Sequence, residues 1–503
     1  MGVLRRIRTL TGPMLVLCLF AIIAANLGLS SFQATKTLSS SGLIPGGTYT
    51  YFVFKDGIYT VMQDYRTGTE ITRSIDATYV INRALNDAAN GGGGSILLRN
   101  GNYSTNNNIL MRSNTALILE AGTIIEATYT AQEVGSLTGE GIIQFLGTGT
   151  SARVVNAHIA SESGRATIKG KSDSAWEVGI EFRYADRCSA KGLEINNIGG
   201  DGVYLRFADQ NVLEDLYVHG YGKYCLVGDM AKGVMLHGGN SGNKLINLHV
   251  DGENLANASG RGNVAFCMQF NGGWGDVRNN EVNGGIYERS GNSHSIYWCS
   301  DNNGVVEGNT AVGGISRGSK NSAYGCGFKL NPARYSYVNW TVYDCSHGID
   351  LGNGGRGGNV GNVIYATITN VTSIGMDFWV QGSTVGQNVE ENTVYAYVTG
   401  SPFGIYFHND ASAECHIMNN TIHLTTRNIR NNAIQIGDND LTANNEVKYN
   451  DFYVDLEADR YGINWDSSGY GRWNRFIGDW QNVHSDSGNV VIETNYFEGT
   501  PTP

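Results

Sequence analysis

Proline, charge and paired cysteines are all scarce in this chain of 503 residues. It has 6 prolines against 68 glycines, and only 16% of its residues are charged. Collagen needs abundant proline and glycine at every third position, so a collagen-like chain is excluded. Little charge and much glycine instead fit many short strands joined by tight turns.

Basic runs and zinc-type cysteine pairs are also missing. No run of Lys or Arg follows residue 8 and the net charge is −11, so we expect no nucleic-acid partner, because phosphate binding needs a basic face. Beyond Cys18 the cysteines are Cys188, Cys225, Cys267, Cys299, Cys326, Cys345 and Cys415. They contain no Cys-x-x-Cys pair and are odd in number, which argues against a zinc site and against a complete disulfide framework. We expect buried free thiols.

The N-terminus has the composition of an export signal. Arg5, Arg6 and Arg8 precede an apolar run from Met14 to Ala25, so residues 1–29 are predicted to be a signal peptide or an N-terminal anchor. Residues 30–47 are rich in Ser, Thr and Gly and are predicted to be a flexible linker. We expect a secreted or cell-surface protein that meets a membrane only through this segment, if it is uncleaved.

An Asn-centred motif recurs through the second half of the chain about every thirty residues. Around Asn280, Asn392, Asn420 and Asn450, an apolar residue stands three positions before the asparagine and another stands two positions after it. The motif places Asn280, Asn309, Asn339, Asn392, Asn420 and Asn450 in one phase. Repeats of this period indicate a solenoid, in which each unit buries its apolar face against its neighbours. The asparagines are predicted to form a ladder of side-chain amides from coil to coil.

A second marker keeps the same period. A small residue is followed by alternating apolar positions, as in Gly202–Leu205, Gly233–Leu236, Gly327–Leu330 and Gly348–Leu351. Together the two markers predict an all-β protein: a solenoid of roughly eleven or more coils, whose strands stack about 4.8 Å apart.

The N-terminal part contains a helical stretch. Asp76 can cap it, Val80, Ile81, Ala84, Leu85 and Ala88 form one apolar face, and Gly91–Gly94 end it. The block from Ala77 to Thr128 resembles the N-terminal segment of the pectate-lyase-like superfamily. The resemblance implies a right-handed parallel β-helix whose open N-terminal end is covered by this amphipathic helix. Covering that end would protect exposed strand edges.

These features divide the chain into successive parts. After the signal and linker, residues 48–130 are predicted to hold strands, the capping helix and the first coils. Residues 131–497 are predicted to form the parallel β-helix, and residues 498–503 a tail. Trimers occur among β-helix rods, so a trimer is an open expectation.

Candidate catalytic residues lie just ahead of the small-residue positions, where the resemblance places active residues. Down the coils this position holds Asp201, Lys232, Val264, His294, Cys326 and His347. Of these, Asp201, Lys232, His294 and His347 could perform acid–base chemistry on a sugar. Longer coils between Gly202 and Gly327 suggest loops that wall a groove. Candidate substrate-binding residues in or beside these loops are Tyr221, Tyr224, Arg261, Tyr287, Arg289 and Arg317.

The resemblance leaves the reaction open. Inverting hydrolysis needs two carboxylates about 6.5–9.5 Å apart, and the chain contains no Asp-Asp pair. We therefore expect an exported protein acting on an acidic polysaccharide by lyase-type proton abstraction, with Asp229 and Asp251 as ligands of a calcium ion. The alternatives are a non-catalytic surface adhesin or glycan-binding rod, a hydrolase, or a C5-epimerase.

Overall fold

The computed structural model describes residues 49–499 apart from a set of short segments. These are residues 133–139, 172, 174–175, 223–230, 254–265, 291–293, 301–303, 320–324, 353–356, 381–384, 410–412, 438–445, 466–470, 481 and 486–494. The predicted signal at 1–29, the linker at 30–47 and most of the tail therefore lie outside the described residues. Within the described part, no helix is both long and apolar enough to cross a membrane.

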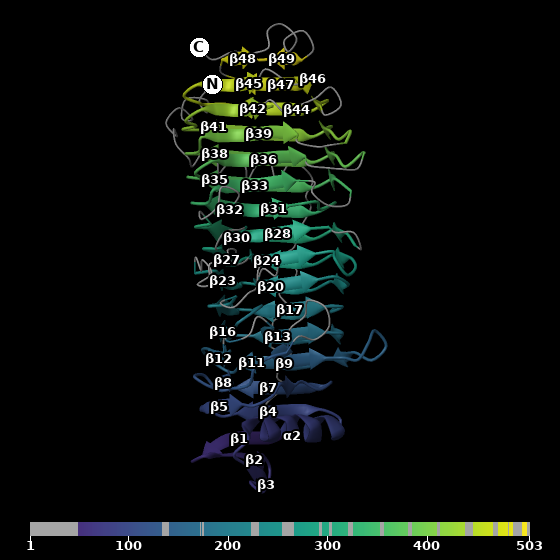
Figure 1. The fold of residues 1–503 in the computed structure, drawn as a ribbon, viewed down its shortest axis with the longest axis vertical. Coiled ribbons are helices and arrows are strands. Elements are labelled where there is room, and N and C mark those ends of the chain that lie inside the picture. Colours follow the sequence, from purple (N-terminus) through teal and green to yellow (C-terminus); the bar gives the residue numbers. More distant parts are fainter. Residues whose placement is uncertain are drawn as a thin grey trace, which may run out of the picture. The chain divides into compact units, whose positions relative to one another are not determined.

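One face of the coils is a 14-stranded sheet in which all pairings are parallel and each strand pairs with its equivalent one coil later. In chain order its strands are β6 (Ile109–Leu110), β9 (Glu140–Leu146), β13 (Glu177–Arg183), β17 (Val203–Arg206), β20 (Lys232–His237), β24 (Phe266–Asn271), β28 (Ile296–Cys299), β31 (Cys326–Leu330), β33 (His347–Gly352), β36 (Ile374–Val380), β39 (Phe403–Asn409), β42 (Asn432–Ile436), β45 (Tyr461–Trp465) and β48 (Val483–Ser485). Figure 1 shows these strands stacked in chain order.

A second sheet has 25 strands and is parallel except for the antiparallel pairs β1–β2 and β2–β3. Its strands are β1 (Tyr51–Asp56), β2 (Tyr59–Asp64), β3 (Glu70–Ser74), β4 (Gly94–Leu98), β5 (Asn102–Thr105), β7 (Thr115–Leu119), β8 (Ile124–Ala127), β11 (His158–Ser161), β12 (Ala166–Lys169), β15 (Ser189–Lys191), β16 (Leu193–Asn196), β18 (Val212–Glu214), β19 (Tyr217–His219), β22 (Lys244–Ile246), β23 (His249–Asp251), β26 (Glu281–Asn283), β27 (Ile286–Glu288), β30 (Thr310–Arg317), β32 (Tyr337–Tyr343), β35 (Val363–Thr369), β38 (Thr393–Thr399), β41 (Thr421–Arg427), β44 (Asp451–Asp455), β47 (Arg475–Asp479) and β49 (Tyr496–Glu498).

Two-residue strands form the remaining small sheets. They are β10 (Val154–Val155) with β14 (Ala185–Asp186); β21 (Asn240–Ser241), β25 (Val277–Arg278) and β29 (Val306–Glu307); and β34 (Asn359–Val360), β37 (Val389–Glu390), β40 (Ile417–Met418), β43 (Val447–Lys448) and β46 (Gly471–Arg472). Coil-to-coil parallel pairing in every sheet makes the fold a parallel β-helix, as predicted. A continuous apolar cluster from Val53 to Phe476 fills its interior.

The helix α2 (Ala77–Asn90) forms where its sequence predicted it. The Asp76 side chain accepts a hydrogen bond from the backbone N–H of Tyr79, and Gly91 ends the helix. The predicted apolar face is buried in the same cluster as the coils, and α2 packs against strands β1–β7. Figure 1 shows α2 beside β4, at the purple end of the coloured chain.

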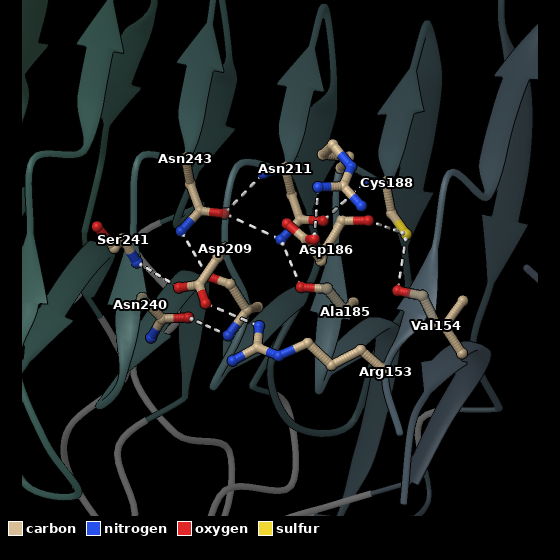
Figure 2. A network of polar contacts seen from close by, with 12 residues as sticks. Arg153, Val154, Ala185, Asp186, Cys188, Asp209, Asn211, Asn240, Ser241 and Asn243 are labelled. Atoms are coloured by element: carbon tan, nitrogen blue, oxygen red, sulfur yellow. Dashed lines mark hydrogen bonds and ion pairs between the residues drawn. The ribbon is translucent and has the colours of Figure 1, made fainter. Parts of the chain in front are cut away.

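The Asn ladder is present and longer than predicted. Side-chain amides donate to the next side-chain oxygen at 2.9–3.1 Å. At one rung Ser336 replaces asparagine: its Oγ accepts from the backbone N–H of Asn309, and its own backbone N–H donates to Asn362 Oδ1. Its members are Asn211, Asn243, Asn280, Asn309, Ser336, Asn362, Asn392, Asn420, Asn450, Asn474 and Asn495. The placement of Asn339 in the ladder was wrong, because Asn339 lies within β32 and pairs with Val312 of β30. Figure 2 shows the start of the ladder, where Asn211 and Asn243 lie beside an ion pair between Arg153 and Asp209.

The small-residue marker has a packing cause. A Cβ on Gly233 would lie 2.1 Å from Val250 Cγ1, and one on Gly202 would lie 2.3 Å from Val218 Cγ1. Valines on the 25-stranded sheet therefore occupy the space that a side chain would need. One predicted position was wrong: Lys232 pairs with Phe266, so Phe266 and not Val264 continues that column. Val264 itself lies outside the described residues.

Candidate functional site

The column of predicted catalytic residues does run along the 14-stranded sheet. The backbone N–H of Lys232 donates to Asp201 Oδ1 at 2.7 Å, so these two residues lie on neighbouring coils. Cys326 pairs with His347, and Cys326 Sγ lies 3.0 Å from His294 Nδ1. His294, Cys326 and His347 therefore follow one another along the stack, whereas Asp201 and Lys232 lie several coils earlier.

Three strands bring an ionisable cluster together beside His347. Lys329 of β31, Asp350 of β33 and Asp377 of β36 are in register on successive coils. His347 Nδ1 lies 3.4 Å from Asp350 Oδ1 and 3.8 Å from Asp377 Oδ2. Lys329 Nζ lies 3.8 Å from Asp350 Oδ2. A single sheet position, repeated coil after coil, thus stacks one amine and two carboxylates.

His408 of β39 extends the cluster by one more coil. Its Nε2 lies 2.8 Å from Asp377 Oδ1, and its ring stacks on Trp379 with centroids 5.4 Å apart. Lys329 Nζ lies 5.0 Å from the centroid of the Trp379 ring, a cation–π distance. Two aromatic rings, Trp379 and His408, therefore lie beside this cluster.

Nearby charges set the protonation of Asp350 and His347. Burial raises the pKa of Asp350, but the positive charges of His347, Lys329 and His294 have the larger combined effect, and the pKa of Asp350 falls to about 2. Burial lowers the pKa of His347, but Asp350 and Asp377 outweigh it, and the pKa rises. Asp350 is therefore ionised at neutral pH, and protonated His347 is favoured. The two Asp side chains keep only 3% exposure each, so they require these cations nearby.

Sequence reasoning missed Lys329, Asp350, Asp377 and His408. The signal was nevertheless in the repeat marker, whose variable position between two apolar residues faces outward. Lys329 and Asp350 occupy this position in Gly327–Leu330 and Gly348–Leu351. The prediction followed the residue ahead of the glycine, and among the new cluster it found only His347.

Two predicted substrate-binding residues are core residues instead. Tyr221 is buried, and its hydroxyl donates to the Phe266 carbonyl at 3.2 Å. Tyr287 is fully buried in the main apolar cluster. Neither ring is available to stack on a sugar, so both predictions were wrong. Tyr224, Arg261 and the predicted calcium ligand Asp229 lie outside the described residues.

Arg289, Arg317 and Asp251 form a separate network at the ends of strands of the 25-stranded sheet. Both oxygens of Asp251 accept hydrogen bonds from the Arg289 guanidinium. Arg317 pairs with Glu288 and donates to the Tyr343 hydroxyl at 2.8 Å. The arginines are therefore occupied by acidic side chains, and the structure does not bring them to the Asp350–Asp377 cluster.

The described residues do not by themselves make a calcium site. The groups whose ligand atoms converge are His249, Asp251 and Glu288; His294, Cys326 and Asp350; and His347, Asp350 and Asp377. Calcium takes about six to eight oxygen ligands, and these groups offer at most two carboxylates together with nitrogen or sulfur. Arg289 and Arg317 already pair with the carboxylates of the first group. We derive no catalytic step through calcium.

A surface hollow of about 320 Å³ lies elsewhere, at the start of α2 among Asp76, Tyr79, Asn82 and Arg83. It contains no member of the acid–base cluster.

Comparison with known proteins finds only distant likenesses among solved structures. No protein-family model and no curated protein matches the chain. Among solved structures it is similar to ORF18 of Geobacillus virus E2, at 15% identity and a TM-score of 0.44, over 70% of this chain and 58% of that one. It is also similar to the tailspike protein of E. coli bacteriophage HK620 in complex with a pentasaccharide, at 13% identity and a TM-score of 0.46, over 86% and 76%. A third is the catalytic unit of a GH87 α-1,3-glucanase from Streptomyces thermodiastaticus, at 12% identity and a TM-score of 0.44, over 84% and 65%.

The chain spans less than two thirds of the length of the first and third of these proteins. Likenesses this distant assign no function to its site. The fold follows from its own strand pairing. The chain has a parallel β-helix fold.

Proposed function

We propose that this protein cleaves a polysaccharide by hydrolysis, with Asp350 and Asp377 as the two carboxylates. The observation that carries the proposal is their register on neighbouring coils, facing outward from the same sheet. Glycosidases of the common type use one such pair across the scissile bond. The sequence contains no adjacent carboxylate pair that would indicate hydrolysis. The coiling of the chain brings together Asp350 and Asp377, which are 27 positions apart.

The separation of the pair favours a double displacement. Oxygen atoms of Asp350 and Asp377 lie within 4.8 Å of each other. Retaining enzymes hold the two carboxyl groups about 5–5.5 Å apart, whereas inverting enzymes leave about 6.5–9.5 Å for a water molecule. Asp350, which stays ionised, is assigned the attack on the anomeric carbon. Asp377 is assigned proton donation to the leaving oxygen, followed by activation of the water that releases the glycosyl group.

The remaining residues of the cluster position and balance this pair. His347 and Lys329 hold Asp350 as an anion, which a nucleophile or charge-stabilising carboxylate must be. His408 contacts Asp377 and so orients the carboxylate assigned to proton transfer. Trp379 and His408 form the aromatic border past which a sugar would approach.

Lyase-type cleavage of an acidic polysaccharide, the reaction expected from the sequence, is the second candidate. The observation that favours it is the pair of cationic groups, Lys329 and His347, beside a His408–Asp377 contact. Two cations could neutralise a uronate carboxylate while the Asp-bound imidazole removes the adjacent proton. Both cations already contact the Asp350 carboxylate, which places this reaction behind hydrolysis.

Product analysis on a panel of polysaccharides tests these candidates. The full chain is incubated with neutral glycans, uronans and sulfated glycans, with added calcium or with EDTA. Hydrolysis produces reducing ends without ultraviolet absorbance, and proton NMR of the first product should show retained anomeric configuration. Absorbance of unsaturated ends would establish a lyase, and altered uronate signals without chain cleavage would establish a C5-epimerase.

Binding without any change in the glycan would identify the surface adhesin or glycan-binding rod instead. Activity that survives EDTA would remove the calcium expectation. Export is part of the same proposal, since the Arg-led apolar segment at residues 1–29 would bring the protein to extracellular glycans.

A further inference from the structure

A second polar column lies on the same outward face, on coils that precede the acid–base cluster. Arg183 of β13 pairs with Arg206 of β17, and His237 of β20 pairs with Asn271 of β24. From β20 to β33 there are four inter-strand steps, which amount to about 19 Å at the usual spacing. A polysaccharide lying along the stack from Asp350 would therefore pass these residues.

Arg206 is bound by rings rather than by an acid. Its guanidinium carbon lies 4.5 Å from the Trp274 ring centroid and 5.2 Å from that of Phe207. Within the described part of the chain no carboxylate reaches ion-pair distance of Arg206, and its buried Nε has no hydrogen-bond partner. Arg183, one coil earlier, pairs with Glu181. Within the described part of the chain, Arg206 thus keeps an Nε donor without a partner and a positive charge that no carboxylate neutralises.

Trp274 is held where a ligand can reach it. It stands in a tight turn in which the Gly275 N–H donates to the Gly272 carbonyl and the Gly273 N–H donates to Asn271 Oδ1. Gly238, at a φ of +60°, lets the turn approach, because a Cβ there would lie 2.6 Å from Trp274 Cβ. The indole is 38% exposed although Arg206 covers part of it.

His237 completes the arrangement as a neutral side chain. Burial, Lys232 and Arg206 lower its pKa to about 3. Burial raises the pKa of Tyr204, so its hydroxyl is protonated, and this hydroxyl and His237 Nδ1 share a hydrogen bond of 2.9 Å. Because His237 is neutral, the positive charge of this region comes from Lys232 and Arg206.

We infer that Arg206, Trp274 and His237 form a binding subsite for a negatively charged sugar residue of the polysaccharide. The indole face stacks on the pyranose ring, and the Arg206 guanidinium takes the anionic group, a carboxylate or an ester sulfate, in a bidentate contact. This inference rests on the proposed function, because the subsite would select an acidic glycan as the substrate of the Asp350–Asp377 cluster. None of its three residues was among the predicted binding residues.

Binding measurements separate this subsite from catalysis. The full chain carrying Asp377→Asn is titrated calorimetrically with a short oligouronate, a sulfated galacto-oligosaccharide and a neutral gluco-oligosaccharide. Adding Arg206→Gln should weaken binding of the acidic oligosaccharide about tenfold or more, the cost of losing a hydrogen-bonded charge. Binding of the neutral oligosaccharide should change less than about twofold, and Arg206→Lys should recover only part of the loss.

The matched control is Arg165→Gln, because Arg165 also covers a ring, that of Tyr217, but on the other sheet. It should leave every affinity unchanged, and thermal unfolding of each variant confirms folding. Preference for the uronate or for the sulfate ester identifies the anionic group. Equal binding of acidic and neutral oligosaccharides, no binding of any of them, or an Arg206→Gln protein with unchanged affinity would overturn the inference. Failure of cleavage in the wild type would reject the proposed function alone.

Discussion

His347 is the residue whose charge makes two buried carboxylates tolerable. Its imidazole faces Asp350 and Asp377, and Lys329 lies on the far side of Asp350. Its folded pKa is raised above the ordinary value of 6.5. A raised pKa means that His347 adds stability below the unfolded pKa. This contribution is lost as the pH rises through the folded pKa.

A His347→Gln variant tests this charge. The wild type should lose unfolding free energy as the pH rises from about 6.5, whereas the variant should be less stable at pH 5–6 and show a flatter profile above it. Denaturant unfolding measured from pH 5 to 9 provides the comparison. The lowered pKa of His237 makes both proteins less stable as the pH falls below about 6.5, so it cancels in their difference. Parallel profiles above pH 6.5 would refute the role of His347.

Only part of this site could be predicted from the sequence. His347 was found because it stands ahead of a repeated glycine. Asp350 and Asp377 were missed because their neighbours in the sequence are apolar, and only the coil register brings them together. Tyr221 and Tyr287 were misplaced because composition does not reveal whether a ring beside a loop turns inward or outward.

The turn between two strands of a coil is fixed by the Asn ladder. Asn280 donates to Asn309 Oδ1 at 3.0 Å, and both its backbone N–H and its side-chain oxygen are used by neighbouring coils. The preceding residue, Asn279, has a φ of +55°, a left-handed conformation that asparagine tolerates well. Each rung therefore satisfies buried polar groups of the neighbouring coils.

Asn280→Ala should destabilise the protein by about 2–4 kcal/mol, because several buried hydrogen bonds are lost and their partners remain. Asn339→Ala is the matched control, since Asn339 is exposed on β32 outside the ladder, and it should cost less than about 0.5 kcal/mol. Urea unfolding gives both values. Equal losses in the two variants would show that the ladder does not stabilise the turn.

The contact between the two large sheets depends on the small-residue column. Gly233→Ala places a methyl group 2.1 Å from Val250 Cγ1 and 2.7 Å from the Cys267 carbonyl oxygen, so it should cost about 1–3 kcal/mol or more. Gly149→Ala, where nothing lies within 4 Å, should be nearly neutral. Thermal unfolding of both variants measures the difference, and a stable Gly233→Ala protein would contradict the packing described.

The helix and the repeating strands were predicted better than the register between successive coils. Asp76 and the apolar face defined α2, and the repeated asparagines defined five of the eleven ladder positions in the described residues. The errors at Asn339 and Val264 are shifts of three and two residues from the observed positions, Ser336 and Phe266, because coil length varies from repeat to repeat. Ser336 replaces an asparagine in the ladder and therefore interrupts the signal that the period depends on.

At the scale of the whole described solenoid, stacking turns single sequence positions into continuous chemical surfaces. The outward face of the 14-stranded sheet carries Arg183 and Arg206 on earlier coils and Asp350 and Asp377 on later ones. A glycan lying along this face would meet binding groups and then the carboxylate pair. Fold alone does not assign this activity, since the same architecture supports many functions.

The rate at which the full chain releases reducing ends from its best glycan, with and without Asp377→Asn, tests the central claim most directly. The control is Asp479→Asn, which changes an exposed aspartate at the end of β47. The account predicts a loss of about a thousandfold in Asp377→Asn, typical of a removed acid–base group, with binding retained and the control fully active. Cleavage at the wild-type rate by a folded Asp377→Asn protein would contradict it.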